Sequence, residues 1–210
     1  KDGKLLEKIA DKEYPMEHQN TMFMKELSLE DFQIKAPIQE GTVKVNCMVY
    51  KDLLLSSTVL ETIELPVHNG LVQLNDSDLK YVAVVNRHPG HDTIGLGIVK
   101  GFGTSCGALA STVSHDCHNL TIVYDTPENA LMAANALKNC GAGLMSLEPA
   151  EELAKDSKKM KQANYDLGLT GMENPLLRIV TLALPVIPNV KMSDLGLVDV
   201  NKKEIIPMFA

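Results

Sequence analysis

The sequence is poor in aromatic residues and has no long apolar run, and these absences exclude several classes of function. Aromatic side chains make up 4% of its 210 residues and tryptophan is missing altogether, which disfavours a surface on which nucleobases stack. The net charge is −7 and no basic stripe occurs, so the chain lacks the footprint of a nucleic-acid-binding protein. No stretch of about 18 apolar residues is present to span a bilayer as a helix. We therefore expect a protein that binds neither nucleic acid nor membrane.

The chain also lacks the CxxC spacing typical of metal-binding and redox sites. Its cysteines, Cys47, Cys106, Cys117 and Cys140, are scattered, which predicts reduced and mostly buried thiols of a cytoplasmic protein. No signal peptide precedes them. The chain begins at Lys1, without an initiator methionine and within a polar segment, so we expect a fragment of a longer protein.

The order of the predicted elements indicates a single domain of the α+β class. Residues 1–40 are charged and weakly periodic, and we interpret them as a segment that lies over a core, with a short capped helical turn at 28–32. Residues 41–210 form the domain. Strand patterns come first and helix patterns later without strict alternation, which predicts a mixed β-sheet with helices packed on it. The predicted strands cover residues 42–50, 58–65, 71–74, 81–85 and 120–124. The first of these is expected to have one solvated face, and the strand 81–85 is expected to be a central strand. The predicted helices cover residues 127–139 and 148–167.

Glycine is frequent in the stretch GLGIVKGFG, residues 95–103. Its spacing fits neither the dinucleotide-binding fingerprint nor the phosphate-binding loop with its Lys-Ser/Thr end. We interpret these glycines as places where a bulge or a close backbone contact lies beside a site. A nucleotide-binding loop is the less favoured reading.

Two groups of polar side chains each come directly after a predicted buried strand. The His115 loop, residues 115–119, has the sequence HDCHN and lies between the apolar run 107–113 and the strand 120–124. The His88 loop, residues 86–92, has the sequence NRHPGHD and follows the strand 81–85. Because functional residues are often placed on loops at strand ends, we expect the candidate site here.

The residues of these loops alone leave several interpretations open. A metal site is one, but the three-residue spacing of His115 and His118 on a strand or turn does not direct both imidazoles to one ion. Asp116 with His88 or His91 would have to complete such a site through tertiary proximity. A nucleophilic cysteine at position 117 is another, although neighbouring residues on a strand point to opposite faces and would separate it from a histidine base. The remaining interpretations are a hydrogen-bond network that joins two loops, and polar groups that line or close a site built mostly elsewhere.

Several blocks of the sequence together carry a resemblance to a known family. They are Arg87 with His88, GLGIVKGFG at 95–103, GALASTVSHDCHN at 107–119, GLMS at 143–146, LPVIP at 184–188 and DLGLVDV at 194–200. In this order they resemble the C-terminal region of bacterial-type adenine deaminases, and they cover most of residues 40–210. Members of that family are amidohydrolases that convert adenine to hypoxanthine and ammonia with a metal centre in an upstream (β/α) barrel.

The resemblance implies that this chain is a C-terminal α+β domain whose partners are adenine, through the full enzyme, and the barrel domain. It implies a divalent metal, manganese or iron, held in the barrel, and no metal ligand in this chain. It also allows a homo-oligomer. The sequence departs from the family in two ways. The barrel with its His-x-His ligands is absent, and the family is longer by a hairpin-sized piece between Ala142 and Gly143.

The resemblance further suggests that the two loops fold over the barrel mouth and complete a dry pocket around the purine. Asn119 and His115 would hydrogen-bond to ring nitrogens and Asp116 would orient a histidine. A non-catalytic interaction or oligomerisation domain and a stand-alone metal-dependent hydrolase are the alternatives. The candidate catalytic residues are His115, Asp116, His118 and Asn119, and the candidate substrate-binding residues are Arg87, His88 and His91.

Overall fold

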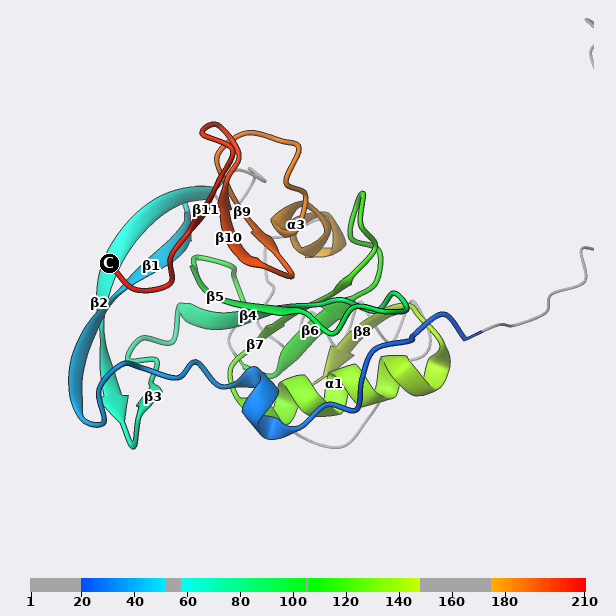
Figure 1. Ribbon diagram of the computed structural model, residues 1–210, viewed down its shortest axis with the longest axis horizontal. Coiled ribbons are helices and arrows are strands. Elements are labelled where there is room, and N and C mark those ends of the chain that lie inside the picture. The colour runs from blue at the N-terminus through cyan, green and yellow to red at the C-terminus, as the bar shows by residue number, and fades with distance from the viewer. Residues whose placement is uncertain (1–19, 52–57, 105, 148–174) are drawn as a thin grey trace, which may run out of the picture.

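A computed structural model describes residues 20–51, 58–104, 106–147 and 175–210 (Figure 1). In these residues a mixed eight-stranded sheet forms the middle of the molecule. Two of its strands, residues 41–50 and 94–100, pair in parallel, and the other neighbours are antiparallel. The strands in spatial order are β3 (Leu71–Val72), β2 (Thr58–His68), β1 (Gly41–Tyr50), β5 (Ile94–Lys100), β4 (Leu79–Val85), β7 (Leu120–Tyr124), β6 (Ala108–Ser111) and β8 (Leu144–Leu147).

Each face of the sheet is covered by a different layer (Figure 1). On one face lie α1 (Pro127–Cys140), the short helix η1 (Leu29–Phe32) and the rest of the N-terminal segment. On the other face lie α3 (Pro175–Leu182) and a small sheet of β9 (Val190–Ser193), β10 (Gly196–Asp199) and β11 (Glu204–Ile206). The architecture confirms the predicted α+β class, the mixed sheet and the single domain.

β4 lies at the centre of the sheet, where the continuous apolar run predicted a central strand. All of its residues are buried. Tyr81 and Ala83 pack in the core on the α1 side, whereas Val82 and Val84 pack in the core on the α3 side. Apolar side chains are therefore required on both faces, which explains why this strand shows no alternation with polar residues.

The helix predicted at 127–139 is confirmed as α1. Both of its ends are specified by residues close to them in the sequence. The Thr126 hydroxyl accepts a hydrogen bond from the backbone N–H of Asn129 (3.3 Å), and Pro127 occupies the first turn. Gly141 ends the helix in the left-handed conformation at φ +89°, which glycine adopts without steric cost. The residues that α1 buries against the sheet are Ala130, Ala133, Ala134 and Leu137.

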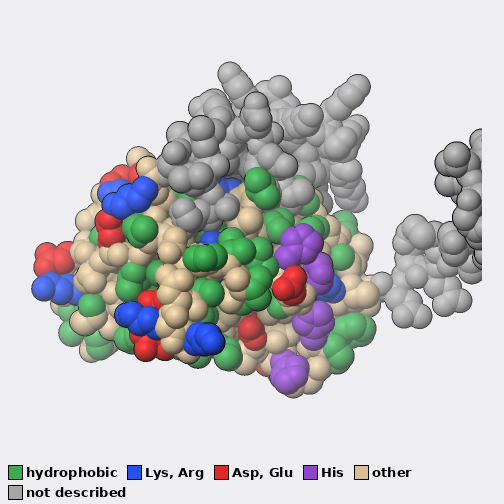
Figure 2. All heavy atoms as spheres, turned by 90° about the horizontal axis from the view of Figure 1, so that it is seen from above, with side chains coloured by type: hydrophobic (Ala, Val, Ile, Leu, Met, Phe, Trp, Pro, Cys, Tyr) green, Lys and Arg blue, Asp and Glu red, His purple; other side chains and the backbone are tan. Residues whose placement is uncertain are grey.

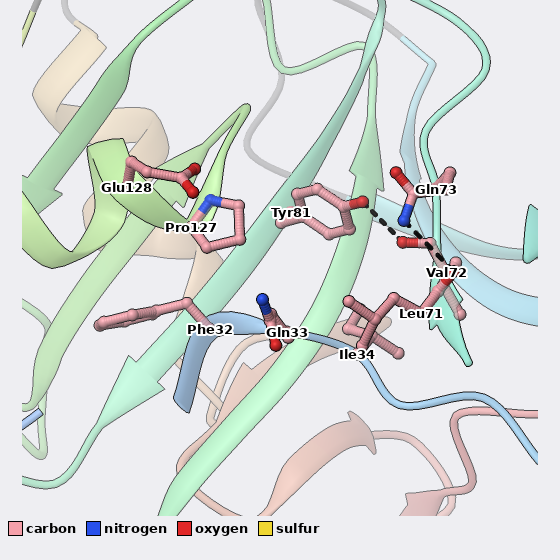
Figure 3. Close-up of a pocket in the computed structure, with 9 residues that line it drawn as sticks. All are labelled: Phe32, Gln33, Ile34, Leu71, Val72, Gln73, Tyr81, Pro127 and Glu128. Carbon is pink, nitrogen blue, oxygen red and sulfur yellow. Dashed lines mark hydrogen bonds between the residues drawn. The ribbon is translucent and has the colours of Figure 1, made fainter. Parts of the chain in front are cut away.

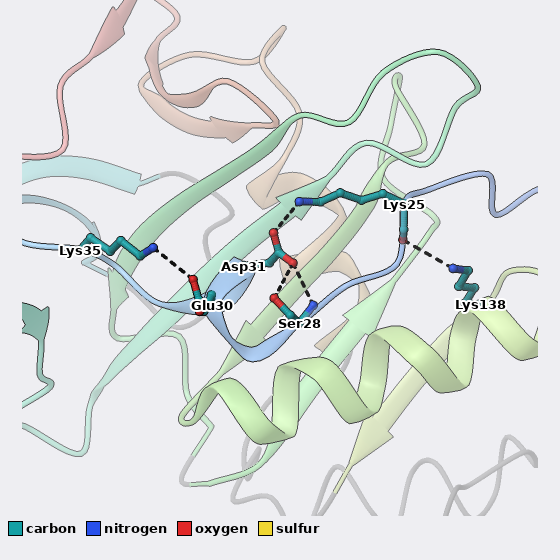
Figure 4. Close-up of polar contacts among 6 residues, drawn as sticks. All are labelled: Lys25, Ser28, Glu30, Asp31, Lys35 and Lys138. Atoms are coloured by element: carbon teal, nitrogen blue, oxygen red, sulfur yellow. Dashed lines mark hydrogen bonds and ion pairs between the residues drawn. The ribbon is translucent and has the colours of Figure 1, made fainter.

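The N-terminal segment is fixed on α1 by polar contacts (Figure 4). Asp31 accepts hydrogen bonds from the backbone N–H of Ser28 (2.8 Å) and from the ammonium of Lys25 (2.5 Å), which closes the predicted helical turn. The Lys138 ammonium on α1 donates to the backbone oxygen of Lys25 (3.5 Å). These contacts help to hold the described part of the segment over the core.

Some sequence expectations differ from the structure. The strand at 42–50 was expected to have one solvated face, but this is wrong for its second half, because Met48 and Tyr50 pack into the core on the α3 side. The apolar run 176–184, to which the pattern assigned no element type, overlaps α3, which covers Pro175–Leu182. The helix expected at 148–167 lies outside the described residues. Of the helices in the described ranges, none is long and apolar enough to cross a membrane.

Candidate functional site

The His88 loop and the His115 loop lie against each other at one end of the sheet. β4 ends where β7 begins, with Val85 opposite Leu120 in the antiparallel pair, so the two loops leave the sheet side by side. The His88 Nε2 atom lies 2.7 Å from the backbone oxygen of Cys117, and the Arg87 Nε donates to the backbone oxygen of His118. The structure therefore brings together the two loops that the sequence singled out.

The His115 loop is a tight turn that presents its side chains outward. The backbone N–H of His118 donates to the oxygen of Ser114 (2.5 Å), and the buried Ser114 and Thr121 hydroxyls share a hydrogen bond of 2.7 Å. The His115 and His118 rings meet edge to face, with centroids 5.5 Å apart. Histidine side chains gather at this end of the molecule (Figure 2). Residues 115–118 are exposed, so their imidazole, carboxylate and thiol groups are available to a ligand.

Asn119 is the exception in this loop because it is 2% exposed. Its Oδ1 atom is buried and has no hydrogen-bond partner in the described part of the chain. A buried acceptor without a donor costs about 1–3 kcal/mol, and such groups are rare in folded proteins. The amide of Asn119 therefore has an unused acceptor that an N–H or O–H group from outside the described residues would satisfy.

Arg87 connects three segments of the chain. Its Nη1 donates to the Thr21 backbone oxygen (2.9 Å) and to the Thr21 hydroxyl (2.7 Å), while its Nε donates to His118. The backbone N–H of Phe23 returns a bond to the Arg87 oxygen (2.9 Å). Burial lowers the pKa of the guanidinium from its usual value. In this arrangement Arg87 and His88 join the two loops to each other, whereas His91 is exposed at the tip of its loop.

The His88 loop is supported by its first residue, Asn86, and by two polar residues that the sequence did not identify, Thr93 and Asp194. Asp194, in the turn between β9 and β10, accepts hydrogen bonds from Asn86 Nδ2 (3.0 Å) and from the Thr93 hydroxyl. Asn86 in turn accepts from the backbone N–H of His88 (3.0 Å). Asp194 lies in one of the blocks that carry the family resemblance, but nothing in the sequence connects it to a loop about a hundred residues upstream.

The glycines of β5 allow the Asp194 turn to approach the sheet. A Cβ atom on Gly95 would lie 2.0 Å from the backbone oxygen of Ser193, and one on Gly97 would lie 2.7 Å from the Met192 sulfur. This confirms that glycines in this stretch serve close contacts with another segment of the chain. A cavity of about 260 Å³ adjoins the turn and is lined by apolar residues of β5 and the small sheet, including Ile94 and Leu195.

The loops do not form a metal centre. Among the described residues, no group of three or more His, Cys, Asp or Glu side chains is placed to hold a metal ion. The divalent metal that the family resemblance implies therefore does not fit the residues assembled here. The Cys117 thiol donates to the backbone oxygen of Ser114 (3.8 Å), so its hydrogen-bond partner is a backbone group and not a histidine base.

A second hollow lies on the α1 side of the sheet (Figure 3). It has a volume of about 210 Å³, and the Tyr81 hydroxyl donates to the Val72 oxygen at its edge (2.8 Å). None of the candidate residues of the two loops lines it. Its lining residues are Phe32, Gln33, Ile34, Leu71, Val72, Gln73, Tyr81, Pro127 and Glu128.

Comparison with known proteins gives matches over most of the chain. A family model described as the adenine deaminase C-terminal domain matches residues 56–142 and 141–204. An adenine deaminase of Moorella thermoacetica is 36% identical over 218 residues, which cover 94% of this chain and 36% of that protein. One of Clostridium botulinum is 33% identical over 231 residues, covering 100% of this chain and 38% of that protein. An adenine deaminase of Brucella abortus is 40% identical over 157 residues, covering 66% of this chain and 27% of that protein.

Two features of these matches concern the extent of the chain. The chain spans only 36–38% of the length of the first two relatives. The match to the family model breaks at residues 141–142, next to the Ala142–Gly143 junction where the family was expected to be longer. The alignment of 231 residues with the Clostridium relative also exceeds the 210 residues of this chain, so that relative has residues that the chain lacks.

Proposed function

Because the chain belongs to the adenine deaminase C-terminal domain family, we propose that it is the C-terminal part of an enzyme that hydrolyses adenine to hypoxanthine and ammonia. In this proposal the His88 and His115 loops close an active site whose metal centre lies in another part of the parent enzyme. No step that involves the metal is assigned to residues of this chain, because the described residues do not assemble a ligand set.

The unpaired Oδ1 of Asn119 carries the proposal. An adenine ring presents N–H groups as well as lone pairs at its edge, and an amide oxygen accepts from such an N–H. A neutral imidazole has one donor and one acceptor, so the exposed His115 of the same loop can serve either kind of ring nitrogen. Together these groups would read a purine edge, whereas an apolar pocket would not discriminate between purines with different hydrogen-bond patterns.

The position of Asn119 also indicates how a closed site would work. Asn119 is buried whereas residues 115–118 of the same loop are exposed, so a ligand that reaches the amide would have to reorder the residues that cover it. Once the turn has closed over the ligand, water is excluded, and hydrogen bonds to the purine strengthen in the less polar surroundings. Asp116, also on this turn, would orient a histidine in the closed state.

The test uses the parent enzyme with Asn119→Ala and His115→Ala. If both residues contact the purine, turnover should fall by about 10²–10³, as for removal of one well-placed donor or acceptor at a dry site. The loss of Oδ1 in Asn119→Ala should not by itself lower the melting temperature, because this atom has no partner to leave unsatisfied. Asn46→Ala is the matched control, since Asn46 is also buried but its amide donates to the Pro207 oxygen (2.9 Å).

The control variant should lose stability and keep activity. If Asn119→Ala behaves in the same way as Asn46→Ala, the His115 loop has a structural role, and the chain is better described as a non-catalytic interaction or scaffold domain. Such a result is the outcome expected if the contacts of Arg87 and His88 exist only to join the two loops.

A further inference from the structure

We infer that Asp194 is a positioning residue, which fixes the His88 loop and through it the His115 loop. A relay of hydrogen bonds runs from the small C-terminal sheet to the candidate site. Its importance for catalysis rests on the proposed function, but the relay itself does not.

The first step of the relay joins the small sheet to the end of β4. The Asp194 Oδ2 atom accepts from Asn86 Nδ2 (3.0 Å) and from the Thr93 hydroxyl. Asn86 and Thr93 stand at the two ends of the His88 loop and are also joined by a backbone hydrogen bond, Asn86 N–H to Thr93 oxygen (3.0 Å). One carboxylate oxygen therefore binds both ends of the loop, and hydrogen bonds to a charged acceptor are stronger than those between neutral groups.

The second step passes from Asn86 to the His115 loop. With its Nδ2 held by Asp194, Asn86 presents Oδ1 to the backbone N–H of His88 (3.0 Å). This bond sets the backbone from which the His88 ring reaches the oxygen of Cys117 (2.7 Å). Because a carbonyl oxygen only accepts, Nε2 must carry the proton, so the contact also fixes the tautomer of His88.

Backbone packing holds the Asp194 turn in place independently of its carboxylate. The space where a side chain on Gly95 would begin is occupied by the Ser193 oxygen, at 2.0 Å, and by the Gly196 nitrogen, at 2.7 Å. The turn is therefore seated directly on the first residues of β5. A contact this close keeps Asp194 within reach of the loop, so that the relay has a rigid starting point.

The experiment compares Asp194→Ala with Asp199→Ala in the 210-residue chain by NMR. Asp199 is the matched control, because it is a carboxylate in the same small sheet that accepts from the backbone of Lys202 (3.0 Å), in the turn leading to β11. In Asp194→Ala the ¹⁵N shifts of the His88 ring should move from those of a fixed Nε2–H tautomer towards an average of both forms. Amide exchange at His88 and His118 should accelerate about fivefold, as for the loss of one or two hydrogen bonds. Asp199→Ala should leave both readouts unchanged.

Equal ring shifts and exchange rates in the two variants would overturn the inference. If Asp194→Ala does not fold, Thr93→Val provides the test instead. This variant removes one of the two donors to Asp194 and should give a smaller change in ring shifts and amide exchange at the same residues. No change at His88 in Thr93→Val would then overturn the relay.

These measurements need no substrate, so an inactive parent enzyme would refute the proposed function without bearing on the relay. In an active parent, Asp194→Ala should lower kcat, and Asp194→Asn, which keeps an acceptor oxygen, should restore part of it.

Discussion

The Nε atom of Arg87 donates a hydrogen bond to the backbone oxygen of His118, the residue that precedes the buried Asn119. The same guanidinium binds Thr21 through Nη1 (2.7 and 2.9 Å). One side chain at the end of β4 thus holds the N-terminal segment and the His115 loop together. The planar guanidinium suits this role because its N–H groups point in fixed, diverging directions.

Replacing Arg87 with lysine should therefore destabilise the chain although the charge is kept. A single ammonium group cannot donate to Thr21 and His118 in the same geometry, and the loss of hydrogen bonds to these exposed acceptors should lower the free energy of unfolding by about 0.5–1.5 kcal/mol. Urea unfolding of Arg87→Lys checks this value. Lys35→Ala serves as the control, because the exposed Lys35–Glu30 pair should contribute little. An unfolding curve for Arg87→Lys that matches the unaltered chain would contradict the assignment.

The elements that the sequence predicted well are those whose signals are local. The burial of β4 on both faces is visible in an unbroken apolar run, and α1 is bounded by Thr126 and Gly141, whose conformations follow from their own chemistry. The sequence located the two polar loops at strand ends but did not establish that they meet, because their proximity is a matter of tertiary structure, and a hydrogen-bond network between them was one of several interpretations left open. The contact between His88 and Cys117 depends on strand order, which the sequence left open.

The parts of the site that the sequence missed depend on contacts between distant residues. Asp194 is 108 residues from Asn86, and no local pattern distinguishes it from the other acidic residues of the tail. The burial of Asn119 beside an exposed His118 likewise reflects tertiary packing and not residue type. The expectation of mostly buried thiols was wrong for Cys117 and Cys140, which are exposed because one lies in the His115 loop and the other at the end of α1.

The exposure of these thiols gives a prediction for their reactivity. Cys117 and Cys140 should react rapidly with a thiol reagent in the native protein, whereas Cys47 should be protected. Burial raises the pKa of the Cys47 thiol to about 12, so little reactive thiolate forms there at neutral pH. Titration with a chromophoric disulfide measures the fast thiols, and repetition after unfolding without reductant should find all four. Only two thiols after unfolding would instead indicate a disulfide.

The burial of Lys191 in β9 predicts that the stability of the protein depends on pH. Burial lowers the pKa of its ammonium from 10.5 to about 8. Below pH 8 the group is protonated in both states and the cost of burying its charge is fully present. Between about pH 8 and 10.5 the unfolded chain binds more protons than the folded one, so the free energy of unfolding rises with pH.

Lys191→Met isolates this effect from the other groups that titrate in the same range. We expect the stability difference between Lys191→Met and the unaltered chain to be largest near pH 7 and to shrink towards pH 10.5, as measured by urea unfolding across this range. Lys202→Met, at an exposed position, is the control for the replacement of a lysine by methionine. A constant difference for Lys191→Met would refute the assignment.

The last prediction concerns catalysis by the chain itself. Hydrolytic deamination requires an activated water, and the described residues contain no group of three or more His, Cys, Asp or Glu side chains placed to hold a metal that would activate it. The purified 210-residue chain, supplied with manganese or iron, should therefore release no more ammonia from adenine than a blank that contains the metal alone. The parent enzyme under the same conditions is the positive control.

Turnover well above the blank, together with metal retained by the purified chain, would contradict this prediction and favour a stand-alone hydrolase built on the two loops. Activity of the parent that depends on Asn119, with none in the chain alone, is the combination expected if the loops close a site whose reactive centre lies outside the described residues.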